Sequence, residues 1–133
     1  MKHSFKIKTH SQTELLDITG EVECIVKESR LEEGICALFS PHTTSGITIN
    51  ENADPSVKAD IVQGLNKLIP MHGHYAHAEG NSAAHIKTSL IGSSEIIPIN
   101  GGALSLGTWQ GIFLCEFDGP RTREVQVQLW GSP

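Results

Sequence analysis

The 133-residue sequence has no long apolar run, no paired cysteines and no signal-peptide pattern at its start. Its apolar runs are a few residues long, whereas a membrane-spanning helix needs about 20. Its three cysteines, Cys24, Cys36 and Cys115, are widely spaced and form no CxxC pair, so we expect neither a disulfide framework nor a cysteine zinc site. These absences favour a reduced, cytoplasmic protein with no membrane partner.

Positive charge is also scarce. The chain has 10 Lys and Arg residues against 15 Asp and Glu, which gives a formal net charge of −5. Proteins that bind nucleic acid need a positive face, so we expect no nucleic-acid partner. Apolar residues make up 38% of the chain, an ordinary value for a globular protein. No repeat or linker divides the sequence, and its length suits a single domain over residues 1–133.

The hydrophobic pattern predicts an α+β fold. Polar and apolar residues alternate over 3–9, 47–51 and 125–129, as in half-buried strands, and residues 35–40 form a short apolar run typical of a buried strand. Helices are predicted after Asp17 or Thr19, from Asp54-Pro55 to Pro70, and from Asn81-Ser82 to Ile91. A hairpin is expected around residues 100–102, followed by a strand that places Trp109 on the same apolar face as Phe113. This mixed order favours one or more mostly antiparallel sheets with two to three helices packed on one side.

Histidine is the unusual feature of the composition, with seven residues. If Asn81 or Ser82 caps a helix, His85 lies about one turn inside it, and its side chain leans back toward the loop that carries His77 and Glu79. A third imidazole could come from His42, which follows a predicted strand. Three neutral imidazoles suit Zn²⁺ with one open coordination position. The alternative is that these are loop and helix-cap histidines that hold no metal.

Other polar residues offer acid–base or anion-binding chemistry. Glu51 follows a strand and is a candidate general acid or base, although its segment also suits the start of a helix. The N-terminus of the helix near Asn81 and Ser82 would attract a phosphate. Arg121 stands close in sequence to Glu116 and Asp118 and could clamp an anion, although Asp-Gly-Pro is also an ordinary turn.

Three sequence blocks resemble the YjbQ family: residues 41–54 (PHTTSGITINENAD), 77–94 (HAEGNSAAHIKTSLIGSS) and 106–121 (LGTWQGIFLCEFDGPR). The resemblance implies a homotrimer whose motif residues gather near a subunit boundary. It also implies a metal cluster drawn from His42, His77 and His85. The resemblance implies catalytic roles for three carboxylates and one arginine near this cluster, namely Glu51, Glu79, Asp118 and Arg121. It implies ligand binding by Asn81 and Ser82, at the start of the third predicted helix.

Members of that family are also described as secondary thiamine-phosphate synthases, which join hydroxymethylpyrimidine pyrophosphate to thiazole phosphate. Three functions therefore stand as expectations. The first is a weak synthase of this kind, and the second is a metal-dependent hydrolase or lyase acting on a small phosphorylated or carbonyl substrate. The third is a trimeric module that binds a metal or anion without catalysis. An imidazole-rich site favours zinc, whereas pyrophosphate chemistry would favour Mg²⁺.

Overall fold

The computed structural model describes all residues from Met1 to Pro133, as eight strands and three helices in one α+β domain. The elements in chain order are β1 (Lys2–Lys8), β2 (Glu14–Asp17), α1 (Thr19–Ser29), β3 (Glu33–Phe39), β4 (Ser45–Glu51), α2 (Pro55–Leu68), α3 (Ser82–Ile91), β5 (Ser94–Asn100), β6 (Ala103–Leu104), β7 (Gln110–Glu116) and β8 (Thr122–Ser132). Every strand pair is antiparallel. The predicted fold class is confirmed.

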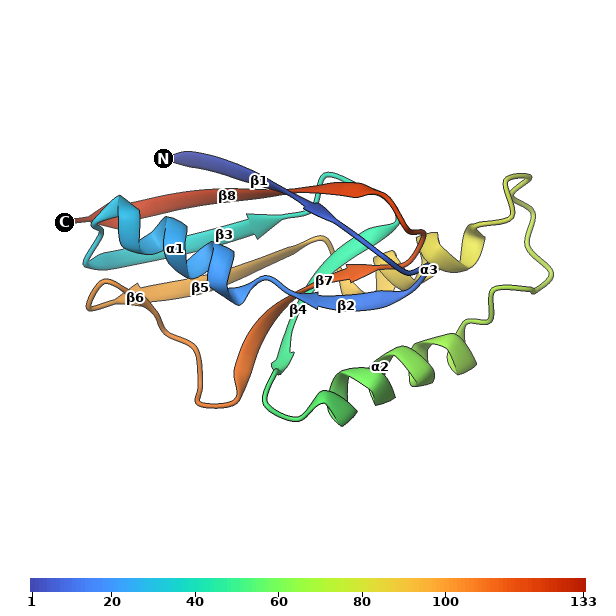
Figure 1. Ribbon diagram of the computed structural model, residues 1–133. Coiled ribbons are helices and arrows are strands. Elements are labelled where there is room, and N and C mark those ends of the chain that lie inside the picture. The colour runs from blue at the N-terminus through green and yellow to red at the C-terminus, as the bar shows by residue number, and fades with distance from the viewer.

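Two sheets face each other across the main hydrophobic core (Figure 1). Sheet A has the strand order β1-β8-β3-β5-β6, and sheet B has the order β2-β7-β4. Alternate residues of β8, beginning with Val125, meet Ile112 and Leu114 of β7 in this core. Helix α1 adds Val22 and Val26 to the same core, so the alternation read from the sequence corresponds to one buried face per strand.

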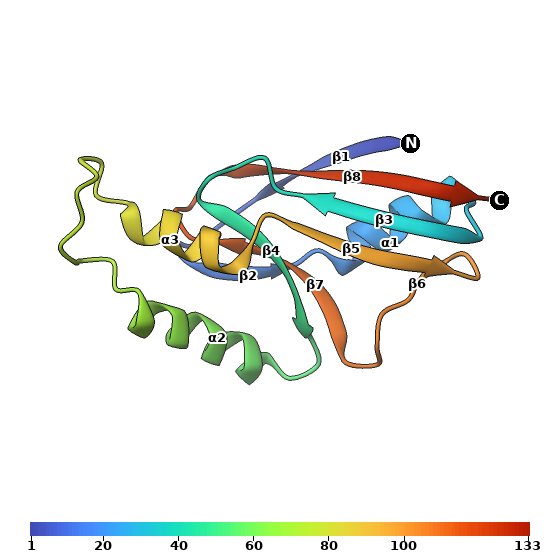
Figure 2. The same cartoon turned by 180° about the vertical axis from the view of Figure 1, so that it is seen from behind.

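Helices α2 and α3 cover the other face of sheet B. There, Phe113 and Cys115 of β7 pack with Leu65 of α2 and Ala84 of α3. Burial raises the pKa of the Cys115 thiol to about 12, so this cysteine is an inert core residue. The two views agree that α2, α3 and the loop between them lie at the end of the molecule opposite both chain termini (Figures 1 and 2).

No helix covers the outer face of sheet A (Figure 2). Apolar side chains from three adjacent strands are exposed on it, namely Ile35 and Phe39 of β3, Ile96 of β5 and Trp130 of β8. The strand register places Ile35 between Trp130 and Pro98. None of the three helices combines the length and the hydropathy that crossing a membrane requires.

A local sequence signal accounts for the start of α2. Asp54 caps α2 by accepting hydrogen bonds from the backbone N and the hydroxyl of Ser56, and Pro55 is the first helical residue, as predicted. The short strand β2 was not predicted. The placement of Trp109 in the core was wrong, because a turn between Gly107 and Gln110 precedes β7 and leaves Trp109 64% exposed.

Candidate functional site

The loop between α2 and α3 brings two predicted site histidines together. His77 lies near the end of this loop and His85 lies one turn into α3, with ring centres 5.4 Å apart and ring planes at 88°. Glu79 is close enough to pair with His77, since its Oε1 lies 4.0 Å from the imidazole Nε2. The predicted backward lean of His85 toward the loop is therefore confirmed. We call His77 and His85 the histidine pair.

Two pockets meet at His85. The first, which we call the loop pocket, has a volume of about 540 Å³ and is lined by His74, Tyr75, Ala76, His77, Ser82, His85 and Ile86. The second, which we call the hydroxyl pocket, has a volume of about 340 Å³ and is lined by His42, Thr43, His85, Thr88, Ser89, Gly92 and Ser93. The loop pocket includes the first residue of α3, and the hydroxyl pocket adjoins the C-terminal part of the same helix.

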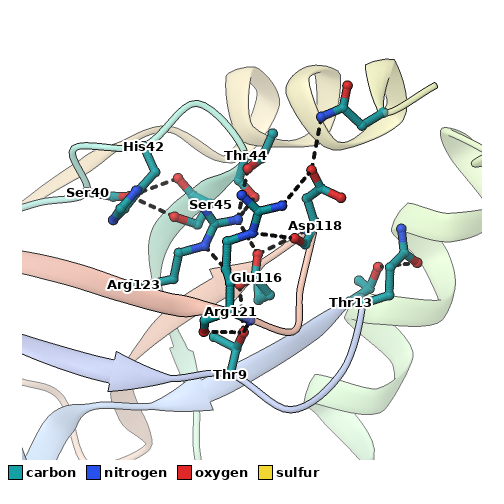
Figure 3. A network of polar contacts seen from close by, with 12 residues as sticks. Thr9, Thr13, Ser40, His42, Thr44, Ser45, Glu116, Asp118, Arg121 and Arg123 are labelled. Carbon is teal, nitrogen blue, oxygen red and sulfur yellow. Dashed lines mark hydrogen bonds and ion pairs between the residues drawn. The ribbon is translucent and has the colours of Figure 1, made fainter. Parts of the chain in front are cut away.

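A network of buried polar side chains lies beneath the bend between β3 and β4 (Figure 3). Glu116 and Arg123 are 0% and 2% exposed and form an ion pair through both guanidinium Nε and Nη2. The same Nη2 donates to the hydroxyl of Thr44 at 2.8 Å, and the hydroxyl of Thr9 donates to Glu116 Oε1 at 2.8 Å. These four residues, the buried network, satisfy each other's charges and hydrogen bonds, as buried ions require.

The buried network adjoins two of the predicted site residues. His42 accepts a hydrogen bond at Nε2 from the backbone N of Glu124, the residue after Arg123. Burial, assisted by the Arg123 charge, lowers the pKa of His42 below its usual 6.5. His42 is thus neutral at pH 7 and, with Nε2 accepting, carries its proton on Nδ1. The backbone N of Asp118 donates to Glu116 Oε2 at 3.0 Å, which fixes the turn after β7.

Asp118 connects the buried network to the start of α3. Its Oδ2 accepts hydrogen bonds from Asn81 Nδ2 at 2.9 Å and from Arg121 Nη2 at 3.3 Å, and its backbone O accepts from Arg121 Nε. The sequence predicted that Asn81 or Ser82 caps α3, but the Asn81 side chain makes no capping hydrogen bond. Its Oδ1 is buried without a hydrogen-bond partner.

Of the two carboxylates near it in sequence, Arg121 pairs with Asp118 and not with Glu116. The partner of Glu116 is Arg123, which sequence reasoning missed. One signal pointed to it: Arg123 has the same strand parity as Val125 and Val127, the inward-facing residues of β8. An arginine on a buried face requires a buried carboxylate beside it.

The structure does not bring Glu51 to the histidines. Glu51 is the last residue of β4 and His42 precedes the strand's first residue, which separates them by roughly 20 Å of extended chain. Glu51 accepts a hydrogen bond from the backbone N of Asp54 and lines a separate 170 Å³ pocket with Asp17 and Lys58. Within one chain, Glu51 serves the loop before α2, so its catalytic role beside the histidines is not supported.

The histidines meet the geometry of a zinc site only in part. Two imidazoles on one tetrahedral zinc, with Zn–N bonds of 2.0–2.1 Å, have ring centres roughly 5 Å apart, which resembles the 5.4 Å of the histidine pair. However, no group of three His, Cys, Asp or Glu side chains is placed to hold a metal ion. His42 would first have to give up its hydrogen bond from Glu124. The three-histidine site stays a prediction, with two of its ligands near each other.

Comparisons with known proteins agree with the sequence blocks noted above. The family model described as UPF0047 protein YjbQ-like matches residues 3–132. The chain belongs to this family. Among curated relatives, a UPF0047 protein of Methanocaldococcus jannaschii is 53% identical over 99% of this chain and 96% of its own length. The UPF0047 protein YugU of Bacillus subtilis is 47% identical over 98% of this chain and all of its own length.

Solved structures from the family have the same fold. A crystal structure of a YjbQ/UPF0047 family protein from Clostridium acetobutylicum superposes with a TM-score of 0.95 at 52% identity, covering 96% of this chain and 99% of its own. A protein from Sulfolobus solfataricus, described as YbjQ-like and of unknown function, has a TM-score of 0.96 at 34% identity, covering 99% and 97% of the two chains. These names give the family and no activity.

Proposed function

We propose that this protein is an enzyme that acts on a small phosphorylated substrate, bound in the loop pocket beside His77 and His85. The observation that carries the proposal is the meeting of two imidazoles at the N-terminal end of α3, in the wall of one pocket. The first backbone N–H groups of a helix and its dipole attract anions, and imidazolium groups add hydrogen bonds to phosphate oxygens. Ser82, the first residue of α3, also lines this pocket.

In this proposal each neighbouring residue has a separate role. His85 binds a phosphate oxygen and His77 donates a proton to the departing group, with the Glu79 carboxylate beside the His77 imidazole orienting it. Asp118 and Arg121 do not touch the substrate. Instead, Arg121 donates a hydrogen bond to Asp118, and Asp118 accepts one from Asn81. The second hydrogen bond connects the turn after β7 to the start of α3.

The reaction that the family resemblance implies fits these roles. In thiamine-phosphate synthesis the bond between the pyrimidine methylene carbon and the pyrophosphate oxygen breaks, and a bond from that carbon to the thiazole nitrogen forms. The protein's contribution is to stabilise the departing pyrophosphate by hydrogen bonds and proton donation. Because His77 and Glu79 are largely exposed to water, hydrolysis of a phosphorylated substrate is the second candidate reaction.

Steady-state turnover tests this proposal. The purified protein is given hydroxymethylpyrimidine pyrophosphate, with and without thiazole phosphate, and both thiamine phosphate and released pyrophosphate are measured. His77→Ala should lower kcat/KM by about 100-fold, the usual contribution of a positioned acid–base group. His85→Ala should also lower kcat/KM, because it removes a contact to the phosphate. The matched control is His72→Ala, an exposed histidine of the same loop that lines neither pocket. Equal turnover in His85→Ala would refute the assignment, and ligand binding without turnover would favour the binding module.

Zinc binding by the histidine pair is a further part of the proposal, supported by the distance between the two rings. Elemental analysis of chelator-treated, zinc-reloaded protein should give near-stoichiometric zinc that is lost in His77→Ala and in His85→Ala. Loss in His42→Ala as well would mean that His42 releases the backbone of Glu124 to bind the ion. If zinc is not taken up and Mg²⁺ binds only together with pyrophosphate, the metal belongs to the substrate.

We also propose a homotrimer, formed through the outer face of sheet A. The exposed apolar side chains of Ile35, Phe39, Ile96 and Trp130 lie on adjacent strands, and contiguous apolar patches of this kind mark interaction surfaces. Light scattering should give three times the chain mass for the wild type and a single chain mass for Trp130→Lys. Asp60→Lys, an exposed change on α2, should leave the trimer intact. A wild-type protein that is monomeric at micromolar concentration would rule the trimer out.

A further inference from the structure

We infer that the hydroxyl pocket is a second subsite, which binds an uncharged, hydroxyl-bearing part of the substrate whose phosphate lies in the loop pocket. This inference rests on the proposed function, and it adds which kind of phosphorylated molecule is selected. Thr43, in the bend between β3 and β4, and Ser93, between α3 and β5, are then specificity-determining residues.

The chemistry of the hydroxyl pocket supports a neutral, hydrogen-bonding ligand. No apolar residue and no Asp, Glu, Lys or Arg lines it. Its walls carry four hydroxyl groups and the imidazoles of His42 and His85. Because hydroxyls both donate and accept hydrogen bonds, these walls complement a polyol better than a second charged group or an apolar chain.

One of these hydroxyl groups is short of a partner inside the protein. Thr88 is 5% exposed and its Oγ1 is buried without a hydrogen bond. The neighbouring Ser89 hydroxyl, in contrast, donates to the backbone O of His85 at 3.0 Å. Leaving a buried hydroxyl unpaired costs stability, so an unpaired one in a pocket wall points to a ligand that supplies the missing bond.

The direction of α3 distinguishes the two pockets. The loop pocket adjoins its N-terminus, where the helix dipole is positive, and the hydroxyl pocket adjoins its C-terminus, where the last carbonyl groups make the potential negative. An anion is therefore favoured in the first pocket and disfavoured in the second. A molecule with a phosphate at one end and hydroxyls at the other therefore binds in one orientation, with its phosphate in the loop pocket and its hydroxyls in the hydroxyl pocket.

The spacing of the pockets sets the length of the molecule. Ser82 in the loop pocket and Ser89 in the hydroxyl pocket are seven residues apart on α3, or roughly 10 Å along the helix axis. An extended six-carbon polyol phosphate spans a similar distance. His85 lines both pockets and lies beside the middle of such a chain.

Two phosphate esters of equal chain length test the subsite. Glucitol 6-phosphate and hexyl phosphate both carry a phosphate on six carbons, and only the first carries hydroxyls. Calorimetric titration of the wild-type protein should give a Kd about tenfold lower for glucitol 6-phosphate, the effect of one or two hydrogen bonds. In the double variant Thr43→Val/Ser93→Ala this preference should fall to about twofold or less, while the Kd of hexyl phosphate stays unchanged. Ser94→Ala, an exposed neighbour outside the pocket, is the control and should keep the full preference.

The outcomes separate this inference from the proposal on which it rests. Equal affinity of the two esters for the wild type, or an equal loss of both in the double variant, would overturn the hydroxyl subsite and leave the phosphate site in place. If neither ester binds, the phosphate site and the subsite both fail. Both proposals together require two results. The wild-type protein must bind glucitol 6-phosphate more tightly than hexyl phosphate, and His85→Ala must bind neither ester.

Discussion

The buried network and the histidine pair are both rich in polar groups, but they are held in opposite ways. Glu116 and Arg123 have almost no exposed surface, and each has several hydrogen-bond partners from different strands and loops. His77 is 43% exposed and Glu79 75% exposed, and their one mutual contact is at 4.0 Å. One hydrogen bond, from Asn81 to Asp118, connects the turn above the network to the start of α3.

The difference separates a structural role from a chemical one. A buried ion pair that is fully satisfied fixes the backbone around it, here the bend that carries His42 and the turn that carries Asp118. Imidazoles with exposed surface can exchange water for a ligand. We therefore expect substitutions in the network to change stability, and substitutions in the histidine pair to change binding and turnover.

The largest effect is expected at Arg123. Replacing it by methionine leaves the Glu116 carboxylate buried without its partner, and such changes cost about 3–5 kcal/mol of unfolding free energy. Urea denaturation of Arg123→Met against the wild type measures this cost. His85→Ala should change the unfolding free energy by less than about 0.5 kcal/mol, because the residue is partly exposed and its side chain is not bonded to the network.

A second variant shows whether the cost comes from the unpaired charge. Arg123→Met/Glu116→Gln removes both charges and keeps an oxygen that can accept from Thr9, so it should recover about half or more of the lost stability. A double variant no more stable than Arg123→Met would mean that the cost is lost packing. If Arg123→Met and His85→Ala prove equally stable, the contrast between the two regions is refuted.

An intermediate effect is expected at Asn81, where the two regions are joined. Asn81→Ala removes a hydrogen bond to the partly exposed Asp118 and should cost about 1 kcal/mol. Asn81→Asp places a second carboxylate against Asp118 and should cost more at pH 7, because two like charges then face each other. Urea denaturation of the two variants at pH 7 measures both effects. Equal stability of the two variants at pH 7 would show that Asp118 does not face residue 81 in solution.

Periodicity predicted the fold well, because the strands and helices here have regular buried faces. The capped start of α2 at Asp54 and the reach of His85 toward His77 followed from rules that act within a few residues. The pairing of side chains that lie far apart in the sequence did not follow from such local rules. Nothing local distinguishes Arg121 from Arg123 as the partner of Glu116. That choice depends on which face of β8 points inward, which only the alternation of the whole strand reveals.

Glu51 and Trp109 illustrate the same limit. A glutamate in a recognisable motif need not lie near the other motifs, and in this fold the length of β4 separates Glu51 from His42. Trp109 lies in the turn just before β7, so the alternation of buried and exposed residues along the strand does not extend to it. Both depend on where a strand ends relative to its neighbours, which is set by sheet register.

The smallest effect is expected at His42, at the edge of the buried network. Burial favours the neutral imidazole in the folded protein and so lowers the pKa of His42, whereas the unfolded chain has the ordinary value near 6.5. Below pH 6.5 the unfolded state therefore binds a proton first, and the contribution of His42 to stability falls as the pH drops toward the folded pKa. His42→Gln keeps an acceptor for the backbone N of Glu124 and cannot titrate in this range.

The stability difference between wild type and His42→Gln should therefore shift in favour of the variant between pH 6.5 and pH 5. Thermal or urea unfolding of the two proteins over this range measures the shift, and the six other histidines cancel in the comparison because both chains carry them. A shift in favour of the wild type would mean that His42 is charged in the folded state. It would then belong with the exposed histidine pair, as a group able to bind an anion, and the boundary drawn here between the fixed and the reactive region would move to include the bend between β3 and β4.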